Sequence, residues 1–215
     1  MLVKDWMSKN LITVKPTDSV VKAQILLIDH NISRLPVMEE GNLLGIITDR
    51  DIRKLLIPSE TLKVKNIMTR NPVTVPLNYT VGETAEILLK HNISGVPVVD
   101  DHGKVAGIIT KGDLFRVLVP LTGVGKKGIQ FALLLADRRG GIKEITDLIR
   151  ENGGRVISVL TSQDDAPRGS LKLYLRMHGL DRQKLKTLKK KIREKASILY
   201  MVDHRENTRE IYMDI

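Results

Sequence analysis

The chain contains an internal duplication, and this feature limits its fold more than any other. Four sequence blocks of the first copy recur in the same order in the second copy. The matched blocks are 3–7 with 64–68, 10–14 with 71–75, 30–37 with 91–98, and 45–52 with 107–114. A unit of roughly 60 residues buries too little apolar surface to be stable alone. The two copies are therefore predicted to pack their sheet faces against each other around a pseudo-twofold axis.

Each copy is predicted to contain a strand, a helix, two strands and a second helix, from the spacing of its apolar residues and its turn signals. The predicted elements of the first copy are a strand at 12–14, a helix capped by Asp18 or Ser19, strands at 35–38 and 43–48 around a turn at 39–42, and a helix at 49–56. The second copy repeats this order, with Tyr79 and Thr80 at the start of its first helix and a turn at 100–103.

Composition and turn residues also predict the domain boundaries. The two copies occupy 1–58 and 62–119, and Pro120 is expected to end the second copy. A Gly-rich, basic stretch follows, so 120–128 is predicted to be a flexible linker. The remaining chain is divided into a third unit at 129–204 and a C-terminal tail at 205–215.

The repeated motifs resemble the cystathionine-β-synthase-type (CBS) domain, and the tandem resembles the paired CBS, or Bateman, module. The resemblance covers roughly residues 1–119 and is carried by Ser-Arg-Leu-Pro-Val at 33–37, Ser-Gly-Val-Pro-Val at 94–98, and the Gly-Ile-Ile-Thr-x-x-Asp blocks at 45–51 and 107–113. It implies an α+β fold with a cleft between the copies. It also implies that an adenosine nucleotide (AMP, ADP or ATP) binds in that cleft as a regulatory ligand.

The third unit shows a different pattern. Its predicted elements are a strand at 129–136, a helix at 142–151, strands at 155–161 and 170–177, a helix from Asp181 to Lys195, and a strand at 198–202. This βαββαβ order fits a ferredoxin-like sandwich. Together with Asp-x-x-Gly-Gly-Ile at 137–142 it resembles an ACT domain, a regulatory fold that often binds amino acids. The order of two CBS copies and an ACT unit resembles the acetoin-utilisation (AcuB-like) group of regulatory proteins.

Two Thr-x-x-Asp motifs, Thr48 with Asp51 and Thr110 with Asp113, lie where a strand runs into a helix. One interpretation is a capping box at each helix start. The other is an anion seat, in which the helix N–H groups and the Thr hydroxyl face a phosphate and the Asp binds two ribose hydroxyls. Lys111 follows the second Thr, whereas Asp49 follows the first. A cation attracts phosphate, so the second seat is predicted to be the better one.

The resemblance implies further residues of the nucleotide site. An apolar slot for the base would be lined by Val14, Val75, Leu35 and Val96, although each could equally be ordinary core. Ser33 and Ser94 begin the Ser-x-x-Pro-Val segments that carry two of these residues. Arg34 has a glycine as its counterpart in the second copy, so one copy alone supplies a guanidinium. It reaches a phosphate or remains a solvated surface residue.

The third unit offers a second candidate site. Asp137, Gly140 and Gly141 could present backbone N–H groups to a small amino-acid effector, or simply form a tight turn that needs glycine. The helix at 182–195 carries many cations, which form either a solvated face or a contact for nucleic acid or an acidic partner. The cations are Lys184, Lys186, Lys189, Lys190, Lys191, Arg193 and Lys195.

Composition narrows the functional classes. The net charge of +10 suits anionic partners. The absence of cysteine excludes thiol nucleophiles and Cys-ligated metals, and one Trp, four Tyr and two Phe are few for a base-stacking protein. We find no nucleophile elbow, Walker motif or metal-ligand spacing, and no secretory signal or membrane-spanning stretch.

The resulting prediction is a cytoplasmic, non-enzymatic, ligand-sensing homodimer without a metal or cofactor. In it, a nucleotide that bridges the two copies shifts the population of cleft geometries, and the hinge passes this shift to the third unit. The alternatives are a regulator that binds nucleic acid through the basic helix and a structural scaffold with empty clefts. No membrane contact is expected.

Overall fold

The duplicated region and the rest of the chain form separate structural units. The computed structural model describes residues 1–55 and 59–212, and the chain divides into Met1–Arg116 and Val117–Ile215. Helix α4 (Lys111–Thr122) contributes residues to both units. No helix in the described part of the chain is long and apolar enough to cross a membrane.

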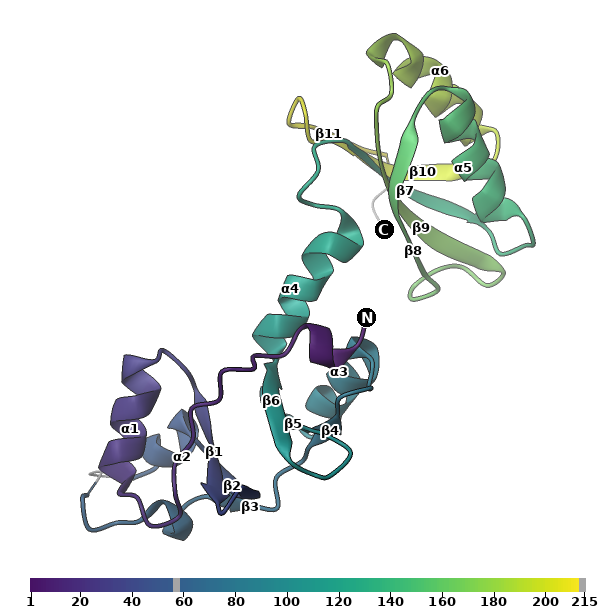
Figure 1. Ribbon diagram of the computed structural model, residues 1–215. Coiled ribbons are helices and arrows are strands. Elements are labelled where there is room, and N and C mark those ends of the chain that lie inside the picture. The colour runs from purple at the N-terminus through teal and green to yellow at the C-terminus, as the bar shows by residue number, and fades with distance from the viewer. Residues whose placement is uncertain (56–58, 213–215) are drawn as a thin grey trace. The chain divides into compact units, whose positions relative to one another are not determined.

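Both copies of the repeat have the predicted helix, two strands and helix (Figure 1). The elements of the first copy are η1 (Val3–Asp5), α1 (Val20–Asp29), β1 (Arg34–Glu39), β2 (Asn42–Thr48) and α2 (Asp49–Arg53). Those of the second copy are η2 (Val64–Asn66), β3 (Thr69–Arg70), β4 (Val75–Pro76), α3 (Val81–Lys90), β5 (Gly95–Val99), β6 (Val105–Thr110) and α4. The predicted N-caps are confirmed, because Ser19 caps α1 and Thr80 caps α3.

Three predicted elements differ from the structure. The strand at 12–14 is reduced to one parallel bridge between Val14 and Val37. Helix α2 ends at Arg53, and the predicted end at residue 56 lies outside the described residues. Helix α4 continues through Pro120 to Thr122, whose hydroxyl donates to the carbonyl of Leu118 at 2.7 Å. A proline near the end of a helix removes only one hydrogen bond, so it does not stop the helix here.

The two copies exchange their leading segments, which the predicted boundaries at 58 and 62 do not anticipate. Strand β3, which leads into the second copy, pairs with β2 of the first copy. The equivalent Ser8 of the first copy pairs with Ile108 in β6 of the second copy, with N–H···O distances of 2.9 and 3.0 Å. Val3 lies in the core of the second copy and Val64 in that of the first. Neither copy is complete without the other.

This exchange explains a glycine in each repeat motif. A Cβ added at Gly45 would lie 2.8 Å from the Met68 sulfur and 2.8 Å from the Thr69 carbonyl oxygen. A Cβ at Gly107 would lie 2.6 Å from the Met7 sulfur and 2.7 Å from the carbonyl oxygen of Ser8. The crossing segment thus packs directly on the backbone of the strand, and only glycine leaves room for it.

The second unit has the βαββαβ order that the sequence predicts. Its elements are β7 (Ile129–Ala136), α5 (Gly141–Glu151), β8 (Arg155–Ser162), β9 (Ser170–His178), α6 (Arg182–Arg193), β10 (Ser197–Asp203) and a further strand, β11 (Thr208–Ile211). The antiparallel sheet has the order β11-β10-β7-β9-β8. Its first strand is therefore central, as in a ferredoxin-like sandwich.

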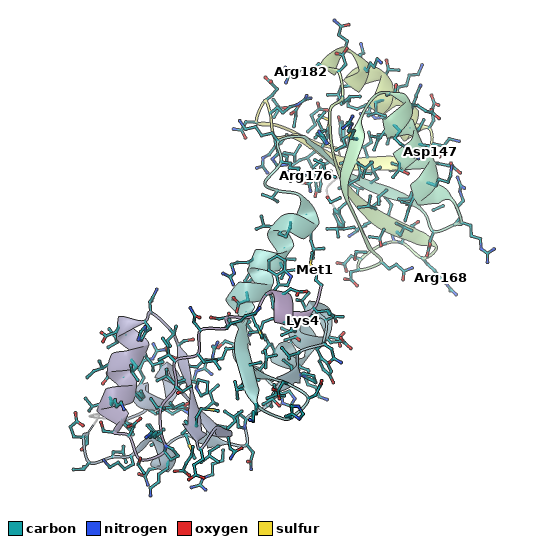
Figure 2. All side chains as sticks on the ribbon, in the orientation of Figure 1. Met1, Lys4, Asp147, Arg168, Arg176 and Arg182 are labelled. Carbon is teal, nitrogen blue, oxygen red and sulfur yellow. The ribbon has the colours of Figure 1, made fainter. Side chains whose placement is uncertain are left out.

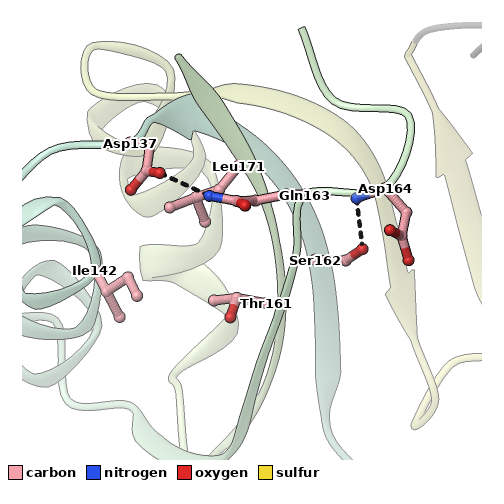
Figure 3. Close-up of a pocket in the computed structure, with 7 residues that line it drawn as sticks. All are labelled: Asp137, Ile142, Thr161, Ser162, Gln163, Asp164 and Leu171. Carbon is pink, nitrogen blue, oxygen red and sulfur yellow. Dashed lines mark hydrogen bonds between the residues drawn. The ribbon is translucent and has the colours of Figure 1, made fainter. Parts of the chain in front are cut away.

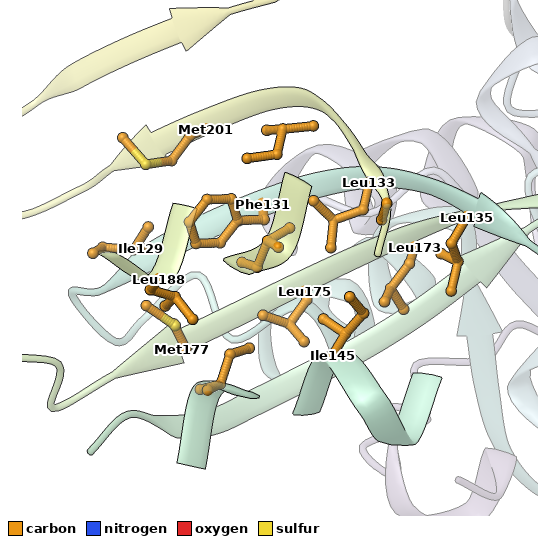
Figure 4. Packing of buried hydrophobic residues seen from close by; sticks show 14 of the residues in the cluster. Ile129, Phe131, Leu133, Leu135, Ile145, Leu173, Leu175, Met177, Leu188 and Met201 are labelled. Atoms are coloured by element: carbon orange, nitrogen blue, oxygen red, sulfur yellow. The ribbon is translucent and has the colours of Figure 1, made fainter. Parts of the chain in front are cut away.

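The core of this unit lies between one face of the sheet and the two helices (Figure 4). Phe131, Leu133, Leu173 and Leu175 alternate inward along the central strands and are fully or almost fully buried. Helices α5 and α6 cover them, and each helix contributes isoleucine or leucine to the cluster, for example Ile145.

The predicted C-terminal tail is wrong where strand β11 forms. Residues 208–211 pair antiparallel with β10, from Tyr200 opposite Ile211 to Asp203 opposite Thr208. A turn with Asn207 at φ 54° reverses the chain. The segment carries little apolar pattern because three of its four residues are exposed at the sheet edge, so its periodicity did not indicate a strand.

Candidate functional site

Two crevices open between the copies of the first unit, with volumes of about 600 and 550 Å³. These volumes are in the range of small-molecule sites. Crevice A is lined by Ser8, Asn10, Leu11, Ile12, Asn31, Ile32, Ser33, Arg34, Asp49, Ser94, Ile108, Thr110, Lys111 and Gly112. Crevice B is lined by Ser33, Arg34, Ile46, Thr48, Asp49, Arg50, Asp51, Arg53, Lys54, Thr69, Pro72, Val73, Asn92, Ile93, Ser94, Gly95, Val96, Pro97 and Lys111.

The two crevices are built from equivalent parts of the repeat. In crevice A, the first copy supplies the wall around Ile12 and Ser33, and the second copy supplies the helix start at Thr110. In crevice B, the second copy supplies the wall around Val73 and Ser94, and the first copy supplies the helix start at Thr48. Each crevice therefore needs both copies.

Both Thr-x-x-Asp motifs form capping boxes. The Thr48 hydroxyl donates to the Asp51 carboxylate at 2.6 Å and accepts from the Asp51 N–H at 3.3 Å. The Thr110 hydroxyl makes the same two bonds with Asp113, at 2.7 and 3.3 Å. Both Thr hydroxyls donate their protons within the capping boxes, so the capping interpretation is confirmed.

The two Asp residues differ in their second oxygen. Oδ1 of Asp113 accepts from Arg116 at 2.6 Å, and Asp113 is buried and does not line either crevice. Oδ1 of Asp51 has its nearest cation, Lys54, at 3.8 Å, and Asp51 lines crevice B. Of the two, Asp51 alone lines a crevice.

Arg34 lies at the meeting point of the crevices and lines both. Its side chain is 7% exposed, and its guanidinium donates to the Ser94 hydroxyl at 2.5 Å. No carboxylate in the described part of the chain lies within ion-pair distance of it. Burial lowers the pKa of Arg34, and the carboxylates of Asp49 and Asp113 counteract this shift. A buried guanidinium without an ionic partner is costly, and an anionic ligand would relieve that cost.

Three of the predicted base-lining residues are core instead. Val14, Leu35 and Val75 are at most 2% exposed and pack inside the hydrophobic clusters, because these positions face the helices. Val96 is also buried, yet it lines crevice B. The predicted residues that do line a crevice are Ser33, Arg34, Thr48, Asp51, Ser94, Val96, Thr110 and Lys111.

Four apolar residues that line the crevices were not predicted from the sequence. Ile12 and Val73 stand two positions before the predicted Val14 and Val75, and Ile32 and Ile93 directly precede the two Ser-x-x-Pro-Val segments. Their equivalent positions in the two copies were a usable signal. They are half-buried or exposed rather than core, which suits contact with an apolar ligand group.

The comparison with known proteins agrees with this architecture. Residues 3–58 and 64–120 match the CBS domain, once for each copy. The chain belongs to the CBS domain family. The family match covers both copies and ends near the boundary between the two units.

Two curated relatives match this chain over about half of its length. The chain is 45% identical over 117 residues to L-aspartate semialdehyde sulfurtransferase of Methanocaldococcus jannaschii, which covers 54% of this chain and 23% of that enzyme. It is 38% identical over 134 residues to a CBS domain-containing protein of Dictyostelium discoideum, covering 55% and 92%. This chain spans under a quarter of the length of the sulfurtransferase, and the match lies in the CBS region.

Solved CBS pairs have a similar fold. The CBS domain pair of protein MJ0100, in complex with 5-methylthioadenosine and S-adenosyl-L-methionine, is 43% identical, covers 59% of this chain and 98% of its own, and gives a TM-score of 0.52. CBSX2 of Arabidopsis thaliana, in complex with AMP, is 30% identical, covers 58% and 98%, and gives a TM-score of 0.50. Both of these neighbours hold adenosine compounds.

The second unit of this CBS protein has a cavity of about 610 Å³ beside the predicted effector turn (Figure 3). It is lined by Asp137, Ile142, Thr161, Ser162, Gln163, Asp164 and Leu171. The Asp137 carboxylate accepts from the Gln163 side chain at 2.8 Å. Gly140 and Gly141 do not line the cavity. Gly140 has φ 83°, which favours glycine, and a Cβ on Gly141 would lie only 3.2 Å from the Leu135 side chain. The tight-turn interpretation holds for these glycines.

The basic helix α6 is partly neutralised within its own unit. Lys189 pairs with Glu210 at 2.7 Å, and Lys195 lies 3.7 Å from Glu144. The Arg193 guanidinium lies 4.9 Å from the centroid of the Tyr212 ring. The remaining lysines of α6 are mostly solvent-exposed, so the structure favours a solvated face over a dedicated binding surface.

Proposed function

We propose that this protein is a non-enzymatic regulatory sensor that binds an adenosine nucleotide (AMP, ADP or ATP) between its CBS copies. The observation that carries the proposal is the buried Arg34 guanidinium, which lacks a carboxylate partner in the described part of the chain and lines both crevices. A phosphate would supply the missing anion. The adenosine compounds held by similar CBS pairs support the same class of ligand.

The roles of the crevice residues follow from their chemistry. Ile93 and Val96 supply an apolar wall for the base, and Oδ1 of Asp51, the oxygen that does not accept from Thr48, accepts from ribose hydroxyls. The cations at the meeting point of the crevices, Arg34 and Lys111, receive the phosphates. The ligand then contacts both copies and favours one arrangement of the pair over others.

A thermal-unfolding panel tests this proposal. The full chain is heated with AMP, ADP, ATP, S-adenosylmethionine or amino acids, each in large excess. A ligand at 100 times its Kd adds about 2.7 kcal/mol of stability, which is readily measured. Stabilisation by at least one of AMP, ADP and ATP is expected. The absence of any shift with these three nucleotides would refute the proposal.

The second unit is proposed to be an ACT-like regulatory domain. Its βαββαβ order and central first strand support this assignment. The cavity beside Asp137 and Asp164 suits the amino group of a small amino acid, because carboxylates attract a cation. The amino acids in the panel test this part separately. The link to acetoin metabolism remains a prediction from the resemblance.

A homodimer is also proposed. Ile28 on α1 and Leu89 on α3 occupy equivalent positions in the two copies and are 68% and 71% exposed. Apolar side chains at the same place on the equivalent helices of the two copies suit a symmetric contact with a second chain. Sedimentation of the full chain as a dimer is expected, and Ile28→Glu with Leu89→Glu should convert it to a monomer.

A further inference from the structure

The two crevices meet at five residues: Ser33, Arg34, Asp49, Ser94 and Lys111. Under the repeat symmetry, Ser33 is equivalent to Ser94, Asp49 to Lys111, and Arg34 to Gly95. The serine pair preserves the symmetry, whereas the other two pairs break it. A single guanidinium therefore stands where a symmetric pair would place two.

The guanidinium of Arg34 lies toward crevice B. It donates to the Ser94 hydroxyl, and a Cβ added at Gly95 would lie 2.2 Å from its Nη1 and 2.8 Å from its Cζ. Gly95 lines crevice B and not crevice A. The guanidinium thus fills the space that a side chain at position 95 would occupy. The charge of Arg34 is therefore held against the wall of crevice B.

The surrounding charges favour the same crevice. Lys111 and Asp49 line both crevices and do not discriminate between them. Arg50, Arg53 and Lys54 line crevice B alone, and no further cation lines crevice A. Part of this charge is compensated, since Arg53 pairs with Asp49 and Lys54 lies 3.8 Å from Asp51. Crevice B still holds a surplus of cations.

We infer that the CBS pair binds one phosphate-bearing adenosine ligand per chain, in crevice B, and that Arg34 determines its specificity for the phosphate. This inference rests on the proposed function. The sequence predicts the phosphate seat at Thr110, in crevice A, to be the better one because Lys111 follows that Thr. The structure favours crevice B instead, because Lys111 lines both crevices and the Arg34 guanidinium packs against Gly95, which lines crevice B alone. Crevice A, without a guanidinium of its own, binds a second phosphate-bearing ligand much more weakly.

Calorimetric titration of the full chain with ADP and with adenosine tests the inference at 150 mM salt. We expect one ADP per chain, bound at least about tenfold more tightly than a second. Arg34→Gln should weaken ADP binding by about tenfold or more, the scale of a charge-assisted hydrogen bond. It should change adenosine binding by less than about threefold, because adenosine carries no phosphate. Arg34→Lys keeps the positive charge and should weaken ADP binding by an intermediate factor. Thermal unfolding of each variant without ligand checks that it is folded.

Three further variants locate the ligand. Arg50→Gln, which alters crevice B alone, should weaken ADP binding by a few-fold. Asn10→Asp places a negative charge in crevice A alone and should leave the tight ADP site unchanged. Arg70→Gln removes an exposed charge outside both linings and should have almost no effect at this salt concentration.

The possible failures are distinguishable. Two ADP sites of equal affinity, an unchanged ADP affinity in Arg34→Gln, or a loss in Asn10→Asp without one in Arg50→Gln would each overturn the inference and leave the proposed function standing. No binding of AMP, ADP or ATP to the wild-type chain would overturn the proposed function itself.

Discussion

The two units of this protein use different ways to make a stable core. The second unit has one continuous hydrophobic cluster under two helices. The CBS pair instead has a small cluster in each copy, and exchanged segments complete each of them. The space left between the copies is lined by both polar and apolar side chains, and it carries a buried guanidinium that has no carboxylate within ion-pair distance in the described part of the chain. The CBS pair thus gives up part of its packing for binding space, and its stability should depend on its nucleotide ligand, whereas the core of the second unit is complete without that nucleotide.

The largest expected effect separates the two units. Phe131 is fully buried in the second unit, and Phe131→Ala should cost about 3–5 kcal/mol of its unfolding free energy. Trp6, the only tryptophan of the chain, packs in the CBS pair. Its fluorescence should report an unchanged unfolding transition, while far-UV circular dichroism shows that the second unit melts earlier. An equal shift of both signals would show that the two units unfold together.

A smaller effect tests the exchange of segments within the CBS pair. Gly107→Ala places a methyl group against the Met7 side chain and the Ser8 carbonyl, and overpacking of this kind costs about 1–3 kcal/mol. The Trp6 fluorescence transition should move to lower temperature. Gly125→Ala, where nothing lies within 4 Å, is the control and should leave that transition in place. If both variants behave alike, the crossing segment does not pack on the strand as described.

The smallest effect is a pH dependence confined to the second unit. Burial and the nearby Arg176 and Arg209 lower the pKa of His204 below its ordinary 6.5, with Asp203 opposing them. The ring accepts from Arg176, labelled in Figure 2, at 3.0 Å. The unfolded chain therefore takes up a proton below pH 6.5 before the folded chain does, and stability should fall as the pH drops from 7 to 5.

His204→Gln should remove this component of the pH dependence, measured by denaturant unfolding at a series of pH values. His178→Gln, which alters an exposed histidine, is the matched control. A pH dependence that persists in His204→Gln and disappears in His178→Gln would contradict the assignment.

The sequence was a good guide wherever structure is set locally. The repeat, the capping residues Ser19 and Thr80, and the βαββαβ order all depend on residues close together in the chain, and all are confirmed. The crevice lining depends on contacts between copies. Val14 and Val75 have the same β-branched character as Ile12 and Val73, and they are buried because Val14 pairs with Val37 and Val75 with Val98, a tertiary contact that the local sequence does not reveal.

Arg34 was predicted as a site residue, but its burial was not predicted. Its glycine counterpart was visible in the sequence, but the burial of the guanidinium against Gly95 follows from the packing of one copy on the other. Strand β11 was missed because an exposed edge strand needs little apolar pattern. Both features are set by tertiary contacts rather than by local residue preference.

Hydrogen–deuterium exchange of the full chain, with and without saturating ADP, tests the central claim most directly. We predict slower exchange at 48–54, 69–73 and 92–97, the segments that line crevice B, and unchanged exchange through the core strands of the second unit. Unchanged exchange at all three crevice segments under saturating ADP, or protection confined to residues 129–212, would contradict the account.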